Sequence, residues 1–85
     1  DQDLLNAVAS AYFLLSDYQS ANAHFSRINP KLVNKPEVGL NYAVTLKKIG
    51  KVGEAQKVFE SVEKPRNAGL ARYYASVENY LGEKQ

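Results

Sequence analysis

Residues 42–62 read YAVTLKKIGKVGEAQKVFESV, and they repeat residues 8–28, VASAYFLLSDYQSANAHFSRI, at a constant offset along the chain. The positions that carry the match are Ala9 with Ala43, Ser16 with Gly50, Ala21 with Ala55, Phe25 with Phe59, and Ile28 with Val62. Such a period, of about 34 residues, is typical of helical-hairpin arrays, in which each hairpin buries one face only by stacking on its neighbour. The repeat therefore indicates an architecture that presents a surface rather than one that encloses a reaction.

Apolar residues at helical spacing predict five helices and no strand. The first, third and fifth are expected over residues 3–15, 36–49 and 66–81. The second is expected from Asp17 to before Pro30, and the fourth from Gly50 to before Pro65. A loop is expected over residues 30–35. Pro36 suits the first turn of the third helix, because a proline lacks only an N–H that has no partner there.

The fifth predicted helix begins a third copy of the repeat. Tyr42-Ala43 followed by Gly50 matches Tyr74-Ala75 followed by Gly82, at a separation slightly shorter than that between Ala9 and Ala43. The chain is therefore predicted to be one all-α domain, residues 1–85, built as a superhelix of antiparallel helical hairpins. Its two and a half repeats are expected at about residues 3–34, 36–66 and 67–85.

Composition limits the classes of function. The 85 residues carry a formal net charge of +2, are 45% hydrophobic, and contain no cysteine and no methionine. No apolar run approaches the ~20 residues of a membrane span, and basic residues alternate with glutamates, so we expect a soluble chain that binds no nucleic acid. The missing cysteines leave cytoplasm and periplasm equally allowed. The missing methionine suggests part of a longer protein.

Small residues at the matching positions have a physical purpose. An alanine lets two helices approach closely where they cross, and a larger side chain there would force the axes apart. The alanines expected at such crossings are Ala9, Ala21, Ala43, Ala55 and Ala75. The aromatic residues at helical spacing are expected in the core: Tyr12, Tyr18, Phe25 and Phe59.

These residues resemble the tetratricopeptide repeat, a helix–turn–helix unit of about 34 residues with small residues at helix crossings and bulky ones beside them. The resemblance covers nearly the whole chain and is carried by Ala9, Ser16, Tyr18, Ala21, Phe25 and Ile28, and by Ala43, Gly50, Val52, Ala55, Phe59 and Val62. Ser16 stands where the family has a turn glycine, and Val52 where it has an aromatic residue. Pro30 and Pro65 fall earlier than the family's proline.

The resemblance implies a concave groove that holds a protein or peptide partner. Carried over residue by residue, the candidate groove residues are Asn6, Ser10, Phe13, Leu40, Asn41, Val44, Lys48, Arg72, Tyr73 and Tyr80. Amide and guanidinium groups among them could bind a peptide backbone or a carboxylate, and the aromatic and leucine side chains could hold apolar side chains. The alternative is a solvated helix face with a few aromatic residues. A chaperone-type carboxylate clamp is not expected, because only Asn41 matches its pattern.

Enzyme chemistry finds little support in the sequence. His24 is the only histidine, and neither a catalytic triad, a metal set nor a glycine-rich phosphate loop can be assembled. We therefore expect a non-enzymatic interaction module without a metal or cofactor. The alternative is a structural spacer in a longer solenoid, as in bacterial secretion, pilus or envelope assembly proteins.

The sequence also predicts a self-association surface on the fifth helix. An apolar stripe there is expected to stay partly uncovered, which favours contact with the next helix of a longer protein or with a second copy. Its residues are Leu70, Tyr74, Val77 and Leu81.

Overall fold

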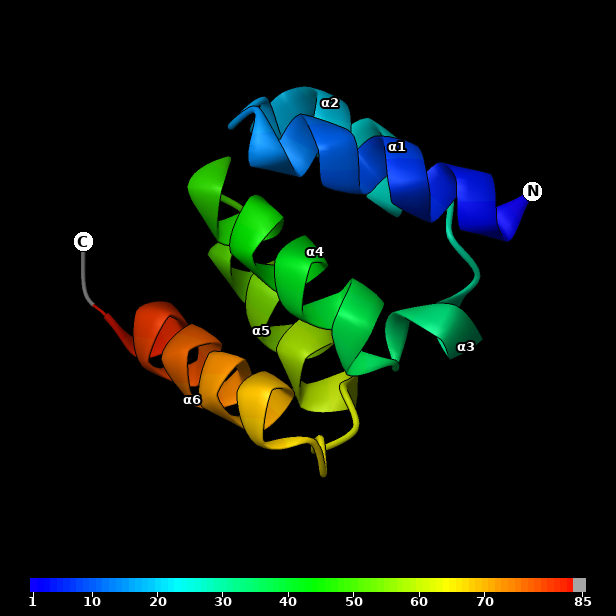
Figure 1. Cartoon of the computed structure of the whole chain (residues 1–85). Helices are drawn as coiled ribbons and strands as arrows, with labels where there is room; N and C mark the ends of the chain where they lie inside the picture. Colours follow the sequence, from blue (N-terminus) through cyan, green and yellow to red (C-terminus); the bar gives the residue numbers. More distant parts are fainter. Residues whose placement is uncertain (84–85) are drawn as a thin grey trace.

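The computed structural model describes residues 1–83, which form six helices and no strand (Figure 1). The helices are α1 (Gln2–Leu14), α2 (Tyr18–Phe25), α3 (Pro30–Val33), α4 (Pro36–Lys48), α5 (Val52–Ser61) and α6 (Ala68–Gly82). Figure 1 shows the α1–α2 hairpin at one end of the molecule, α6 at the other, and the α4–α5 hairpin between them. The prediction of an all-α chain is confirmed.

The number of helices differs from the prediction, because α3 occupies the segment expected to be a loop. The Asn29 side chain accepts a hydrogen bond from the Lys31 N–H at 2.9 Å and caps this helix, with Pro30 in its first turn. Proline is pre-organised for that position, so Pro30 starts a helix, whereas α2 has already ended at Phe25. The short helix brings Val33 into the core.

The turn inside each hairpin takes the same backbone form. Ser16 has a φ of 60° and Gly50 a φ of 87°, both in the left-handed region. Glycine adopts this conformation without steric cost, whereas serine does not. The two hairpins therefore close in the same way, but the first closes with strain.

Two clusters form the core and are joined by Tyr42 and Val58, which pack against both. One contains Ala9, Ala21, Phe25, Ile28, Val33 and Val38, and the other contains Leu40, Ala43, Leu46, Ala55, Phe59, Val62, Val77 and Leu81. The Phe25 and Tyr42 rings stack with centroids 5.3 Å apart, and the Phe59 and Tyr74 rings meet at 4.7 Å. The same aromatic contact thus recurs from one hairpin to the next.

Four of the five predicted crossing alanines are fully buried, namely Ala9, Ala21, Ala43 and Ala55. Ala75 is exposed, contrary to the prediction, because within residues 1–83 no helix lies over that side of α6. Of the residues expected in the core, Tyr12 and Tyr18 are only half-buried.

A glycine sets the closest approach between elements. A Cβ on Gly39 would overlap the Val33 carbonyl oxygen and the Val62 side chain. Gly39 therefore lets the start of α4 lie directly against the end of α3 and the residue that follows α5.

Two of the four residues of the predicted self-association stripe are covered within the chain itself, and whether the chain self-associates stays a prediction. Val77 and Leu81 are buried in the core, and Leu70 and Tyr74 are half-buried, because α6 packs on α4 and α5 with this face. The exposed large apolar side chains lie mostly at the other end of the molecule, where Leu4, Leu14 and Leu15 are 62%, 81% and 75% exposed. Among the described helices none has the length and apolar character that crossing a membrane requires.

Candidate functional site

A pocket of about 240 Å³ lies between α4 and α6, on the face that the sequence assigns to partner binding. Its lining residues are Val44, Lys48, Tyr73, Ser76, Val77 and Tyr80. Val44, Lys48, Tyr73 and Tyr80 are among the candidate groove residues, so the structure brings these together. An apolar floor with a few polar groups is the usual character of a binding site.

A tyrosine on the wall of this pocket is fixed by a side chain of α4. The Tyr73 hydroxyl donates a hydrogen bond to Asn41 Oδ1 at 2.5 Å. Burial raises the pKa of the Tyr73 phenol above its ordinary value, and the nearby Tyr18 phenol raises it further. The hydroxyl is therefore protonated at neutral pH and remains a hydrogen-bond donor to Asn41.

Lys47 and Lys48, two neighbouring residues at the end of α4, approach the Tyr80 ring in different ways. The Lys47 ammonium is buried, lies 4.2 Å from the ring centroid, and donates to the carbonyl oxygens of Tyr80 and Glu83. It therefore satisfies carbonyl groups at the end of α6, where a cation is favoured by the helix dipole. Lys48 is exposed, with its ammonium 5.3 Å from the Tyr80 centroid and 5.7 Å from that of Tyr18.

Aromatic contacts lead from Lys48, at the edge of the pocket, to the first hairpin. The rings of Phe13 and Tyr18 meet edge to face with centroids 5.9 Å apart, and Tyr18 in turn faces Lys48. Residues of α1, α2, α4 and α6 thus form one aromatic surface around a single exposed ammonium group. Such a surface suits a partner that offers both apolar and hydrogen-bonding groups.

The other candidate groove residues lie elsewhere. Leu40 is fully buried in the core and does not line the surface, which corrects the sequence prediction, because α5 and α6 both pack on α4. Arg72 is exposed outside the pocket, and its carbonyl accepts a hydrogen bond from the Ser76 hydroxyl at 3.0 Å. Asn6 and Ser10 are half-buried on α1 and do not contribute to the pocket.

Sequence reasoning missed Tyr18 as part of this surface. Its aromatic character and helical spacing assigned it to the core, but it stands directly after Asp17, whose side chain caps α2 by accepting from the Ser20 N–H at 3.2 Å. A residue in the first turn of α2 lies beside the end of α1, next to the groove side. Its position after the cap is the signal that would have identified it.

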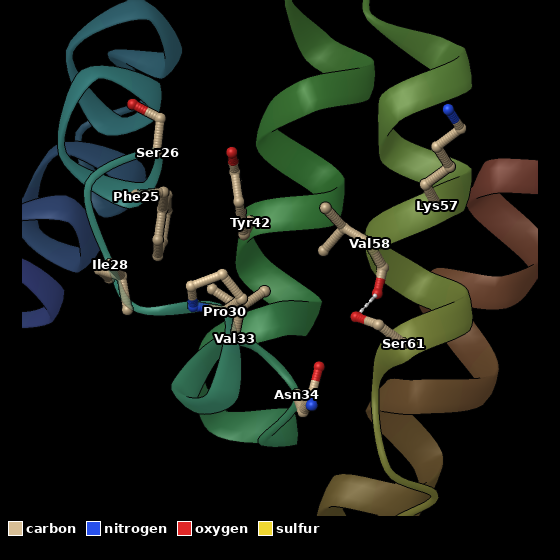
Figure 2. Close-up of a pocket in the computed structure, with 10 residues that line it drawn as sticks. All are labelled: Phe25, Ser26, Ile28, Pro30, Val33, Asn34, Tyr42, Lys57, Val58 and Ser61. Carbon is tan, nitrogen blue, oxygen red and sulfur yellow. Dashed lines mark hydrogen bonds between the residues drawn. The ribbon is translucent and has the colours of Figure 1, made fainter.

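A second pocket, of about 290 Å³, lies among α2, α3, α4 and α5 and contains none of the candidate residues (Figure 2). Its lining is largely apolar, from Phe25, Ile28, Val33, Tyr42 and Val58. Figure 2 shows the Tyr42 hydroxyl directed toward the end where Ser26 and Lys57 lie, with Asn34 and Ser61 at the opposite end. Burial raises the pKa of the Tyr42 phenol, and Glu54 adds to the rise.

The Asn34 side chain ties α3 to α5 beside this second pocket. With its amide nitrogen turned toward the neighbouring acceptors, the Asn34 side chain donates to the carbonyl oxygens of Pro30 at 3.3 Å and Ser61 at 3.2 Å. The Asn34 carbonyl accepts from the Glu63 N–H at 2.8 Å. These bonds serve the fold, so the polar groups of the second pocket that remain for a partner are those of Ser26, Tyr42 and Lys57.

The single histidine is occupied within its own helix. His24 Nδ1 lies 2.8 Å from the Ser20 carbonyl oxygen, so this nitrogen carries the proton, and the ring packs 5.4 Å from that of Tyr12. In residues 1–83 no three histidine, aspartate or glutamate side chains gather where they could hold a metal ion. The groups that the candidate site offers to a partner are aromatic rings, amides and an ammonium.

Comparison with protein families, with curated proteins and with solved structures finds no match to this chain.

Proposed function

We propose that this chain is a non-enzymatic protein-interaction module of the tetratricopeptide type that binds a peptide segment of a partner on its α4–α6 face. The observation that carries the proposal is the pocket beside Lys48, in which Tyr73 is held by Asn41 and Tyr80 by the Lys47 side chain. Aromatic side chains fixed on helices lose little conformational entropy when a ligand binds. The internal repeat, in which residues 42–62 match residues 8–28, supports the same conclusion.

The binding face is expected to combine two kinds of contact. The exposed Lys48 ammonium offers charge, and the rings of Tyr18, Tyr73 and Tyr80 offer apolar surface. A peptide of mixed apolar and polar character is the ligand that such a surface suits. In the second pocket the polar groups lie at the two ends, and it contains none of the predicted groove residues.

The test uses a random twelve-residue peptide library selected on the whole immobilised chain. Peptides enriched on the unaltered protein are expected to lose at least ten-fold in affinity for Lys48→Glu, because this substitution reverses the charge in the pocket. Lys57→Glu is the matched control, since it makes the same charge change beside the second pocket. Enrichment of no peptide, or peptides sensitive to Lys57→Glu alone, would contradict the proposal.

A second role, as a structural segment of a longer helical array, is favoured by a different observation. Leu4 and Leu15 on the outer side of the first hairpin are largely exposed, whereas the equivalent positions of later helices are covered. A segment that spaces other parts needs stacking surfaces at its ends.

A further inference from the structure

The outer face of α1 carries a continuous apolar stripe that no described helix covers. Leu4, Val8, Ala11 and Leu15 follow one another at spacings of four, three and four residues, and such residues share one side of a helix. Leu4 and Leu15 are 62% and 75% exposed, Ala11 is also exposed, and Val8 is half-buried. We call these four residues the α1 stripe.

Two hollows flank the α1 stripe, so the surface there has ridges and grooves. One, of about 370 Å³, is lined by Ala7, Val8, Ala11, Tyr12 and Leu15. The other, of about 290 Å³, is lined by Asp1, Leu4, Leu5, Val8, His24 and Arg27. Ridges that alternate with grooves are the surface against which a second helix packs.

The same face occurs twice more in this chain, and there it is covered. The equivalents of the α1 stripe are Val38, Tyr42, Thr45 and Ile49 in α4, and Leu70, Tyr74, Val77 and Leu81 in α6. Val38, Thr45, Val77 and Leu81 are buried, and the other four are half-buried. Repeat position therefore selects this face for contact with a preceding hairpin.

The covering hairpins share a chemical pattern on their second helices. In α2 an alanine is followed four residues later by a phenylalanine, Ala21 and Phe25, and in α5 the same spacing gives Ala55 and Phe59. Phe25 stacks on Tyr42, and Phe59 packs on Tyr74, which are the α4 and α6 equivalents of Val8. Valine is smaller than tyrosine, so the larger hollow beside Val8 has room for such a ring.

From these contacts we infer that the α1 stripe is a docking site for an amphipathic helix from outside these 85 residues, with an alanine and, four residues later, an aromatic residue on its apolar side. A second copy of the chain does not supply this helix, because Phe25 and Phe59 are already buried in their own cores. The site is distinct from the α4–α6 pocket and does not depend on the peptide binding proposed there, but it shares with the second proposed role the exposure of Leu4 and Leu15.

The experiment uses a peptide with the chain's own α5 sequence, KVGEAQKVFESVEK, residues 51–64. A side-chain staple between positions 53 and 57, both exposed in the structure, holds it helical and avoids the cost of ordering a short peptide. Added to the ¹⁵N-labelled full chain, it should shift the amide resonances of Leu4, Val8, Ala11 and Leu15. The same peptide with Phe59→Ala should bind at least ten-fold more weakly.

Leu15→Lys in the full chain should also weaken peptide binding at least ten-fold, because it places a charge in the α1 stripe. Leu14→Lys is the matched control and should leave binding unchanged, since Leu14 is 81% exposed and is equivalent to Lys48, on the groove side. Absence of binding, or shifts confined to other helices, would overturn the inference. A dimer of the chain that Leu15→Lys disrupts, without peptide binding, would assign the stripe to self-association instead and would also overturn it.

Discussion

The two hairpins of this molecule share a spacing but not an environment. The second, α4–α5, has α2 and α3 on one side and α6 on the other. Within residues 1–83, α1–α2 has a packed neighbour on one side only. Leu40 of α4 is therefore fully buried, while its α1 equivalent, Asn6, is half-buried. The difference teaches that burial follows from neighbours in the stack, not from position within the repeat.

The two hairpins also differ in the residue at the turn and in a buried polar atom. Ser16 and Gly50 occupy equivalent turns in the left-handed region, and only the serine has a side chain there. Asn6 Oδ1 is inaccessible to solvent and accepts no hydrogen bond from any residue in 1–83. The second hairpin has neither defect at its equivalent positions, Gly50 and Leu40.

The largest effect is expected at Gly39, where the middle hairpin is packed most tightly. Gly39→Ala should lower the free energy of unfolding by about 2–3 kcal/mol, since its Cβ overlaps a backbone oxygen that cannot move freely. Urea unfolding followed by circular dichroism measures the change.

Gly53→Ala serves as the control for that measurement. A Cβ on Gly53 meets nothing within 4 Å, and alanine is the better helix former, so the variant should be unchanged or up to about 0.5–1 kcal/mol more stable. Equal losses for both glycines would show that the approach of α4 to α3 is not the constraint.

An intermediate effect is expected when Asn6 of α1 is replaced by leucine, the residue at the equivalent position of α4. Asn6→Leu should raise the free energy of unfolding by about 1 kcal/mol, because an acceptor without a partner is removed from a solvent-free position. Asn41→Leu is the contrasting variant and should lose stability, since it leaves the Tyr73 hydroxyl without its acceptor. A comparable loss in both variants, measured by urea unfolding, would mean that Asn6 has an unseen partner such as water.

The smallest effect is expected at the turns. Ser16→Gly should stabilise the chain by about 0.5–1 kcal/mol, because relief of the left-handed conformation outweighs the entropy that glycine adds to the unfolded state. Gly50→Ser should cost a similar amount, because it introduces that strain into the second hairpin. Thermal unfolding of both variants gives the comparison, and shifts of the same sign would break the equivalence of the two turns.

Much of the candidate site could be anticipated from the sequence. Val44, Lys48, Tyr73 and Tyr80 lie at predicted groove positions and line the α4–α6 pocket. Leu40 does not, and Tyr18 joins the surface from a position assigned to the core. The repeat pattern sets the side of the helix on which a residue lies, but it does not say how many helices pack against that side.

The sequence by itself determined five of the six helices, the turn within each hairpin and four of the five alanine crossings. These depend on residues close together in the chain: a period near 3.6, a cap, and a small side chain every hairpin. The short helix at residues 30–33 was missed although its signals, Asn29 and Pro30, are local. Only the tertiary structure decided that Ala75 is exposed and that Leu81 is buried. It also decided that the apolar surface lies on α1 rather than on α6. The physical reason is that burial is a property of a pair of surfaces, and the sequence of one surface does not specify whether the other is present.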